Sequence, residues 1–225
     1  MLVVNRLFDR SIKRQEFNTL VPKQWVTETV IDCMFELLTL KSHIHAAYKG
    51  MKKPDFFVMI GFTEMIFSMD LKSPETPNYF SGQFKKAAPF DNPENYNKIF
   101  IPMCTNEERT HFSLLVIHHD LKQIHNIDSA PDCNNIIDIQ QTREYKVKQF
   151  LCFLNKEYEN YKLINEFNSL QDICPHGFQT NDIDCGIFTI LHAEHISQKG
   201  IIDLNKKVKQ NLISSKKFTT KFIQF

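Results

Sequence analysis

The 225-residue sequence lacks the features of membrane and secreted proteins. No apolar run reaches the ~18 residues that a membrane-spanning helix needs. The first ten residues, MLVVNRLFDR, carry an arginine at position 6, so no apolar signal-peptide core develops. The six cysteines form no CxxC pair, and several lie in apolar patterns that are typical of buried free thiols. We therefore expect an intracellular protein, in cytoplasm or nucleus, that keeps its cysteines reduced and associates with no membrane.

The sequence also lacks an excess of either charge. Lys+Arg 27 against Asp+Glu 26 gives a net charge of +1, which favours neither nucleic acid nor an acidic partner. One segment departs from this balance, since residues 199–225 hold seven lysines and one aspartate, a local charge of +6. Such a run attracts nucleic acid or acidic lipid in some proteins. We interpret it as a solvated basic C-terminal extension and expect no nucleic-acid partner.

Repeats, low-complexity segments and zinc-type ligand spacings are absent as well. The cysteines and histidines that form a loose collection are Cys104, His111, Cys133, Cys174 and His176. Because they lack zinc-type spacing, we expect no metal site and no other cofactor. A chain of this length is expected to form one domain with a substantial core. We predict a monomeric catalytic domain over residues 1–198, with its core at about 25–197.

Hydrophobic periodicity predicts a mixture of helices and strands. Residues 25–40 and 143–158 have apolar side chains in helical spacing, whereas 98–103 reads as a short strand. Residues 54–70 fit either state. Residues 71–97 hold four of the nine prolines and are interpreted as a loop with one short helix near 79–84, and 161–184 as a long connection. Helices around a central, mostly antiparallel set of strands make an α+β fold.

The most informative stretch runs from Gln179 through Asp184 to Cys185 and Gly186. A helix is expected to begin at the cysteine, capped by Asp184, and the positive end of its dipole would favour thiolate over thiol. Gly186 leaves room for a substrate beside the sulfur, and Gln179 is placed to hydrogen-bond an oxyanion. The pattern predicts a nucleophile. A buried structural cysteine and a solvated loop glutamine are the alternatives.

A base and an orienting acid lie on a predicted β-hairpin. The apolar run 111–117 and the alternating run 123–128 flank a turn, which we centre between His119 and Asp120. That register brings His111 beside Asp128, so a carboxylate holds the imidazole while its other nitrogen faces a nucleophile. An Asx-turn before Pro131 is the alternative for Asp128. The other nearby histidines, at 118, 119 and 125, lack a position at the start of the strand.

The order His111, Asp128, Gln179, Cys185 resembles the catalytic set of the ubiquitin-like protease family, cysteine proteases that process SUMO and related modifiers. Similar motifs are the His-Phe-Ser-Leu-Leu-Val strand, the Gln-x5-Cys-Gly element, the helix start at Trp25 and the strand at 99–102. The resemblance spans about residues 25–197. It implies a papain-like cysteine protease fold and cleavage after the C-terminal Gly-Gly of a ubiquitin-like modifier, in precursors or isopeptide conjugates.

Two positions depart from the family pattern. Phe112 stands where the family usually has tryptophan, and Glu28 stands where it usually has aspartate. In the family two tryptophans flank a narrow tunnel for the Gly-Gly tail. Trp25 with Phe112 would supply flat apolar walls for that tail, although Trp25 as an ordinary core residue is the alternative. The shape of this pocket leaves the choice of modifier open.

Two other functions use the same residues. A related acyltransferase would employ the His-Asp-Cys set to move an acetyl group through a thioester. An inactive relative would only bind a modifier's tail, although such a protein has no chemical need for a complete catalytic set. Spacing alone does not separate hydrolase from transferase, because they differ only in the acceptor that reaches the acyl-enzyme.

Overall fold

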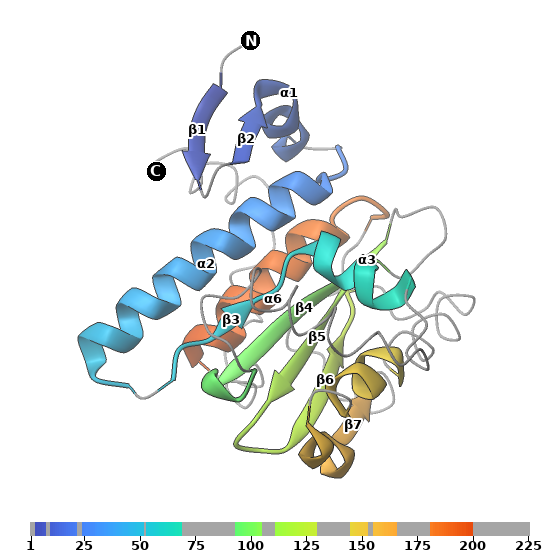
Figure 1. The fold of residues 1–225 in the computed structure, drawn as a ribbon. Coiled ribbons are helices and arrows are strands. Elements are labelled where there is room, and N and C mark those ends of the chain that lie inside the picture. The colour runs from blue at the N-terminus through green and yellow to red at the C-terminus, as the bar shows by residue number, and fades with distance from the viewer. Residues whose placement is uncertain are drawn as a thin grey trace.

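The computed structural model describes residues 3–7, 10–21, 24–51, 53–68, 93–104, 111–129, 145–152, 155–165 and 181–199. Within these ranges, no helix is both long and apolar enough to cross a membrane. A small two-stranded antiparallel sheet and two short helical turns precede the main body (Figure 1). The sequence patterns did not predict these elements, which are β1 (Val3–Leu7), β2 (Arg10–Lys13), α1 (Arg14–Phe17) and η1 (Asn18–Leu20).

A five-stranded sheet with the order β3-β4-β5-β6-β7 forms the centre of the molecule. The three middle strands pair antiparallel, and each edge strand pairs parallel with its neighbour. Helices flank this sheet (Figure 1), so the predicted α+β class with a mostly antiparallel sheet is confirmed. The strands are β3 (Phe56–Phe57), β4 (Lys98–Cys104), β5 (Phe112–His118), β6 (Gln123–Ile127) and β7 (Lys162–Asn165).

Both faces of the sheet are covered, because β4 is buried along its whole length and β5 along nearly all of it. Successive side chains of a strand point to opposite faces, so each strand contributes to two cores. Helices α2 (Glu28–Lys49) and α6 (Cys185–Lys199) pack on one face, against side chains that include Phe100, Leu114 and Val116. Helix α3 (Ile60–Ser68) and the helical residues 145–152 pack on the other, against Ile101, Leu115 and Ile117.

Helix α2 begins at Glu28, three residues later than predicted, but it is longer than its apolar pattern predicts because it ends at Lys49 rather than at residue 40. Its stop is Gly50, which has φ 65° in the left-handed region. The Gly50 N–H donates to the carbonyls of Ala46 and Ala47, as glycine commonly does just past a helix end. The polar residues after 40 thus continue the helix.

Other boundaries also differ from expectation. Residues 54–70 contain both states, with β3 followed by α3. Within the predicted helix 143–158, residues 145–152 are α-helical, and the 3-10 helix η3 (Lys156–Asn160) has its own N-cap at Asn155. The long connection 161–184 begins with strand β7, which was missed. Residues 71–92 of the proline-rich segment, which include the predicted short helix at 79–84, lie outside the described residues. The described part of the segment begins with the 3-10 helix η2 (Pro93–Asn95).

Helix α6 is held at both ends. At its C-terminal end, the Ser197 hydroxyl donates to Asp55 Oδ2 at 2.7 Å. The same buried carboxylate accepts from the Asn97 side chain at 2.9 Å, so α6 is tied to the strands. At its N-terminal end α6 packs against α2 and the start of β5, which fixes its first residue, Cys185.

Candidate active site

Cys185 is the first residue of α6 and is buried, with 2% of its surface exposed. The Asp184 carbonyl accepts from the Phe188 N–H at 2.9 Å, so Asp184 occupies the N-cap position. The Asp184 carboxylate accepts from the Asn181 side-chain amide at 2.8 Å. The sulfur therefore lies at the N-terminal, positive end of a 15-residue helix.

His111 lies immediately before β5, and its ring is held by a carboxylate. Its Nε2 is 2.8 Å from Asp128 Oδ1 and 2.9 Å from Asp128 Oδ2. Both residues are buried, and Asp128 follows the last residue of β6. A side-chain hydrogen bond also joins His111 to Cys185. Because Nε2 is occupied by the carboxylate, Nδ1 is the ring nitrogen left for the thiol.

The electrostatics of His111 favour its charged form. Burial alone lowers the pKa of this imidazole, but the hydrogen bonds and charges of Asp128 and Cys185 outweigh burial and raise the pKa from 6.5 to about 10. An imidazolium flanked by a carboxylate and a thiol is the charge distribution that a thiolate nucleophile requires. The three groups thus form one hydrogen-bonded unit.

The hairpin that brings His111 and Asp128 together has a different register from the predicted one. Leu114 pairs with Ile127 and His118 with Gln123, so the turn centres between Asp120 and Leu121. The predicted centre, between His119 and Asp120, was wrong. The difference shifts the pairing by two residues, which keeps every side chain on its face because strands have a period of two. His111 and Asp128 therefore meet as diagonal neighbours instead of as direct partners.

The other histidines of the hairpin have different partners. His119 Nδ1 lies 2.9 Å from the Tyr161 hydroxyl, and burial lowers the pKa of His119 to about 4. His125 Nε2 lies 3.0 Å from Gln123 Oε1. His119 is also half-buried, although it lies in the turn of the hairpin. These contacts leave His111 as the imidazole of the hairpin that serves Cys185.

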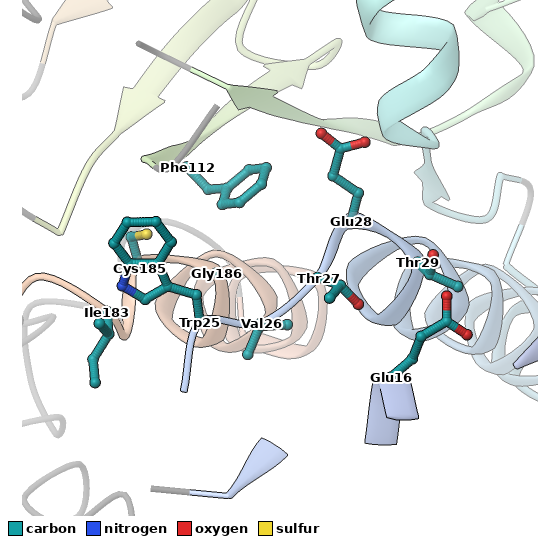
Figure 2. Close-up of a pocket in the computed structure, with 10 residues that line it drawn as sticks. All are labelled: Glu16, Trp25, Val26, Thr27, Glu28, Thr29, Phe112, Ile183, Cys185 and Gly186. Atoms are coloured by element: carbon teal, nitrogen blue, oxygen red, sulfur yellow. The ribbon is translucent and has the colours of Figure 1, made fainter. Parts of the chain in front are cut away.

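A pocket of about 420 Å³ opens beside the sulfur. Figure 2 shows Trp25, Phe112 and the Cys185 sulfur at one end of it, and Glu16 and Thr29 at the other. Trp25 is 47% exposed, which is not the burial of a core residue, whereas Phe112 is 5% exposed. The two predicted wall residues thus border the same pocket as the nucleophile. Its lining consists of Glu16, Trp25, Val26, Thr27, Glu28, Thr29, Phe112, Ile183, Cys185 and Gly186.

The sequence motifs gave no sign of Glu16 as a pocket residue. It lies on α1, before the motifs that identified the rest of the site, and no local pattern distinguishes it from a solvated glutamate. Gln179 lies outside the described residues, so its oxyanion role stays a prediction. Cys133, Cys174 and His176 of the Cys/His collection also lie outside the described residues. Among the residues that the structure places, no group of His, Cys, Asp and Glu is arranged to hold a metal ion.

Gly186 lies where α6 closely approaches the start of α2. A Cβ at this position would lie 3.2 Å from Ile31 Cδ1 and 3.3 Å from Val26 Cβ, closer than ordinary contacts. The glycine therefore permits close packing of the two helix N-termini. The predicted role, leaving the sulfur accessible to substrate, remains a prediction, because this Cβ would point into the core more closely than toward Phe112, at 3.7 Å.

Gly186→Ala is expected to lower thermal stability. Overpacking of this kind costs ~1–3 kcal/mol, which exceeds the ~0.5–1 kcal/mol that alanine gains over glycine within a helix. The measurement is the melting temperature by circular dichroism. Gly61→Ala is the matched control, since Gly61 is the second residue of α3 and a Cβ added there would have no neighbour within 4 Å. Equal effects at both glycines would contradict the packing role.

Asp128→Asn is expected to destabilise the protein in a pH-dependent way. The raised pKa of His111 means that this imidazole binds a proton more tightly in the folded state than in the unfolded chain. That contribution is fully present below pH 6.5 and is lost as the pH rises toward about 10. Melting temperatures of wild type and Asp128→Asn should therefore differ most at about pH 6 and converge toward about pH 10. Each kcal/mol lost from the free energy of unfolding should lower the melting temperature by ~2–4 °C. A difference that stays constant with pH would reject this coupling.

A buried thiol, an imidazole hydrogen-bonded to it and a carboxylate that holds the imidazole make up the site of a cysteine protease. Residues 24–221 match the Ulp1 protease family, C-terminal catalytic domain. The chain belongs to this family, as the sequence motifs indicated. The match begins after α1 and continues past residue 198, the boundary predicted for the catalytic domain.

Solved structures share the fold at low sequence identity. The SUMO protease Ulp1 with its catalytic cysteine oxidised to a sulfinic acid is 18% identical, with a TM-score of 0.66 over 88% of this chain and 78% of that chain. The Ulp1 protease domain in complex with Smt3, the yeast ortholog of SUMO, is 19% identical, with a TM-score of 0.65 over 89% and 78%. The Chaetomium thermophilum Ulp1-like SUMO protease catalytic domain is 18% identical, with a TM-score of 0.55 over 85% and 70%. No curated protein matches the chain significantly.

Proposed function

We propose that this protease cleaves the bond after the C-terminal Gly-Gly of a SUMO-type modifier, in precursors, in conjugates or in both. The observation that carries the proposal is the hydrogen-bonded set of Cys185, His111 and Asp128 beside a pocket, in a chain of the Ulp1 protease family. The solved complex of the Ulp1 protease domain with Smt3 supports the choice of modifier. An intracellular location, in cytoplasm or nucleus, agrees with such a substrate.

In the proposed reaction the Cys185 thiolate attacks the carbonyl carbon of the last glycine. His111, charged because its pKa is raised, gives its proton to the leaving amine, which departs as the C–N bond breaks. Water then attacks the thioester with His111 as base, and the modifier leaves with a free carboxylate. Asp128 keeps Nε2 occupied, so that Nδ1 faces the sulfur in both steps.

The oxyanion would be stabilised from two sources. The first N–H groups of α6 have no acceptor within the helix, since the first intrahelical bond is donated by Phe188. Gln179 is the proposed side-chain donor, six residues before the nucleophile. Donors of this kind act because they are already oriented when the charge develops.

The pocket supports selection of a glycine tail. Trp25 and Phe112 border it next to the sulfur, and a tail without side chains passes between aromatic walls that exclude bulkier residues. We assign most of the modifier's affinity to its folded body. Glu28 and Thr29, at the start of α2, are placed to contact it because they line the pocket away from the sulfur.

Purified protein is expected to hydrolyse SUMO-type precursors that end beyond Gly-Gly, with kcat/KM at least about tenfold above that for ubiquitin, a ratio that corresponds to about 1.4 kcal/mol of discrimination. The measurement is release of a C-terminal fluorescent amide from a panel of modifiers. Acetyl-coenzyme A is tested in parallel, with mass spectrometry of acceptor proteins. Acetyl transfer without amide cleavage would replace the hydrolase by an acyltransferase, and tight modifier binding without either reaction would indicate an inactive relative.

A further inference from the structure

The outer face of α2 carries a stripe of exposed apolar side chains. Leu37 and Leu40 are 38% and 41% exposed, Ile44 is 61% exposed and Tyr48 is 85% exposed. Their spacing, i, i+3, i+7 and i+11, places all four on one side of the helix. The stripe spans about 16 Å along the axis, or three helical turns. We call these four residues the α2 stripe.

The stripe is not the face by which α2 joins the fold. The buried face of α2 contains Val30, Ile31, Phe35 and Leu38, which pack into the core against α6 and the sheet. Single exposed apolar residues are ordinary on protein surfaces, but a row in helical spacing exposes a contiguous patch. Figure 1 shows that the C-terminal part of α2 extends away from the small β1–β2 sheet, which lies nearer the other end of the helix. The described elements therefore leave this half of the outer face open.

Exposed lysines flank the C-terminal half of the stripe. Residues 37–54 contain four lysines and no aspartate or glutamate. Lys49 and Lys53 are exposed, and Lys41 is 60% exposed although it forms an ion pair with Glu194 at 2.7 Å. Along the helix, Lys41, His45 and Lys49 follow each other at i, i+4 and i+8, so they form a row beside the apolar one. An apolar row bordered by lysines fits a partner whose apolar row is bordered by carboxylates.

We propose that the α2 stripe is a docking site for an acidic amphipathic helix of a partner protein. Such a helix would lay apolar residues at i, i+4, i+7 and i+11 against Leu40, Ile44 and Tyr48, while its carboxylates meet Lys49 and Lys53. Leu37, the first residue of the α2 stripe, lies nine residues after the pocket residue Glu28, or about 13 Å along the helix. The stripe and the pocket can therefore be occupied at the same time. The site is thus an exosite that binds without taking part in the chemistry.

The charges disfavour two other occupants. A second copy of this chain would bring its own lysine row against this one, and like charges across an interface weaken association. The segment 200–225 of the chain itself holds six lysines and one aspartate, so it is repelled by the same row. An acidic helix would instead be attracted by the lysines that repel these two occupants.

Binding is tested by fluorescence anisotropy with a labelled peptide of about 18 residues, long enough to cover the stripe as a helix. The probe has leucine at i, i+4, i+7 and i+11 and glutamate at the flanking positions of an alanine-rich helix. Saturable binding is expected, and Ile44→Glu/Tyr48→Ala should weaken it at least about tenfold, since apolar anchors dominate such contacts. Lys49→Glu should weaken it several-fold, and salt should weaken it as well because exposed charges are screened. Tyr145→Ala is the matched control, as Tyr145 is also exposed on a helix, at 58%.

Each contrary result has a definite meaning. Equal binding of the peptide to wild type and to Ile44→Glu/Tyr48→Ala, or no binding to either, overturns the proposal. A wild-type dimer that Ile44→Glu dissociates, seen by light scattering, would assign the stripe to a second copy instead. Competition by a synthetic peptide of residues 200–225 would assign it to that segment. Unchanged amide hydrolysis and melting temperature in the stripe variants show that they remain folded and that the result is independent of the protease reaction.

Discussion

Cys185→Ala is expected to lose all covalent labelling by a SUMO-type modifier that carries a C-terminal vinyl sulfone or propargylamide. Both probes require a thiolate that adds to the electrophile, and alanine offers no nucleophile. Amide hydrolysis should fall by on the order of 10⁴-fold or more, because the proposed reaction passes through a thioester at this atom. Labelling is read as a mass shift on a gel, and turnover as release of a fluorescent amine.

The chain offers a matched control for this experiment. Cys152 is a free thiol that is half-buried, and is therefore more accessible than Cys185 by exposure alone. Burial raises the pKa of the Cys152 thiol, so it lacks the features of an activated nucleophile. Cys152→Ala should label like wild type. Labelling that survives in Cys185→Ala and disappears in Cys152→Ala would move the nucleophile.

His111→Ala is expected to lower kcat by on the order of 10⁴-fold or more, since it removes the base and the proton donor of the reaction together. Wild-type His111 is bonded on one side to Asp128 and on the other to Cys185, so its loss breaks the hydrogen-bonded unit in the middle. Modifier binding should change little, because the ring is buried beneath the site and binding is proposed to depend on α2 and the pocket walls. The measurement is kcat and KM for amide release, with modifier Kd by calorimetry.

Added imidazole sharpens this test. A cavity in place of the ring gives free imidazole access to the sulfur, so part of the lost rate should return in His111→Ala and none in Cys185→Ala. His45→Ala is a suitable control, as His45 is exposed on α2 away from the pocket. Retention of wild-type kcat in His111→Ala would exclude this histidine from the mechanism.

The catalytic hairpin shows which parts of a site can be read from a sequence. The parity of strand positions was enough to predict that His111 and Asp128 share a face, and the structure brings them to 2.8 Å. The register was wrong by two residues because the turn carries no glycine or asparagine that would mark it. Its left-handed position is taken by Lys122, with φ 50°, a conformation that lysine adopts uncommonly. Alternation fixes the face of a residue but not its direct partner.

Helix ends follow the same reasoning. Helix α2 was predicted to stop where its apolar pattern weakens, after residue 40, yet the backbone continues until Gly50 permits a left-handed stop. The exposed Ile44 and Tyr48 are the reason the pattern misled, because they do not belong to the buried face. The spacing of apolar residues indicates which face of a helix is buried, whereas the capping residues indicate where the helix ends.

Short elements that depend on distant partners were missed. Strand β7 has four residues, and its pairing with β6 is parallel, so no local hairpin signal announces it. Glu16 reaches the pocket from α1 through tertiary packing alone. The position of Trp25 was predicted from a family motif, and the structure places this residue on the pocket.

The nucleophile and its base lie on elements that are far apart in the sequence, α6 and the start of β5, and this separation bears on how the enzyme matures. Until α6 docks on the sheet, Cys185 has no neighbouring imidazole and reacts as an ordinary cysteine. Long-range contacts of this kind form late, because their closure entropy is met only after local structure has formed. Labelling of Cys185 by a modifier probe is therefore expected to require that α6 has docked on the sheet.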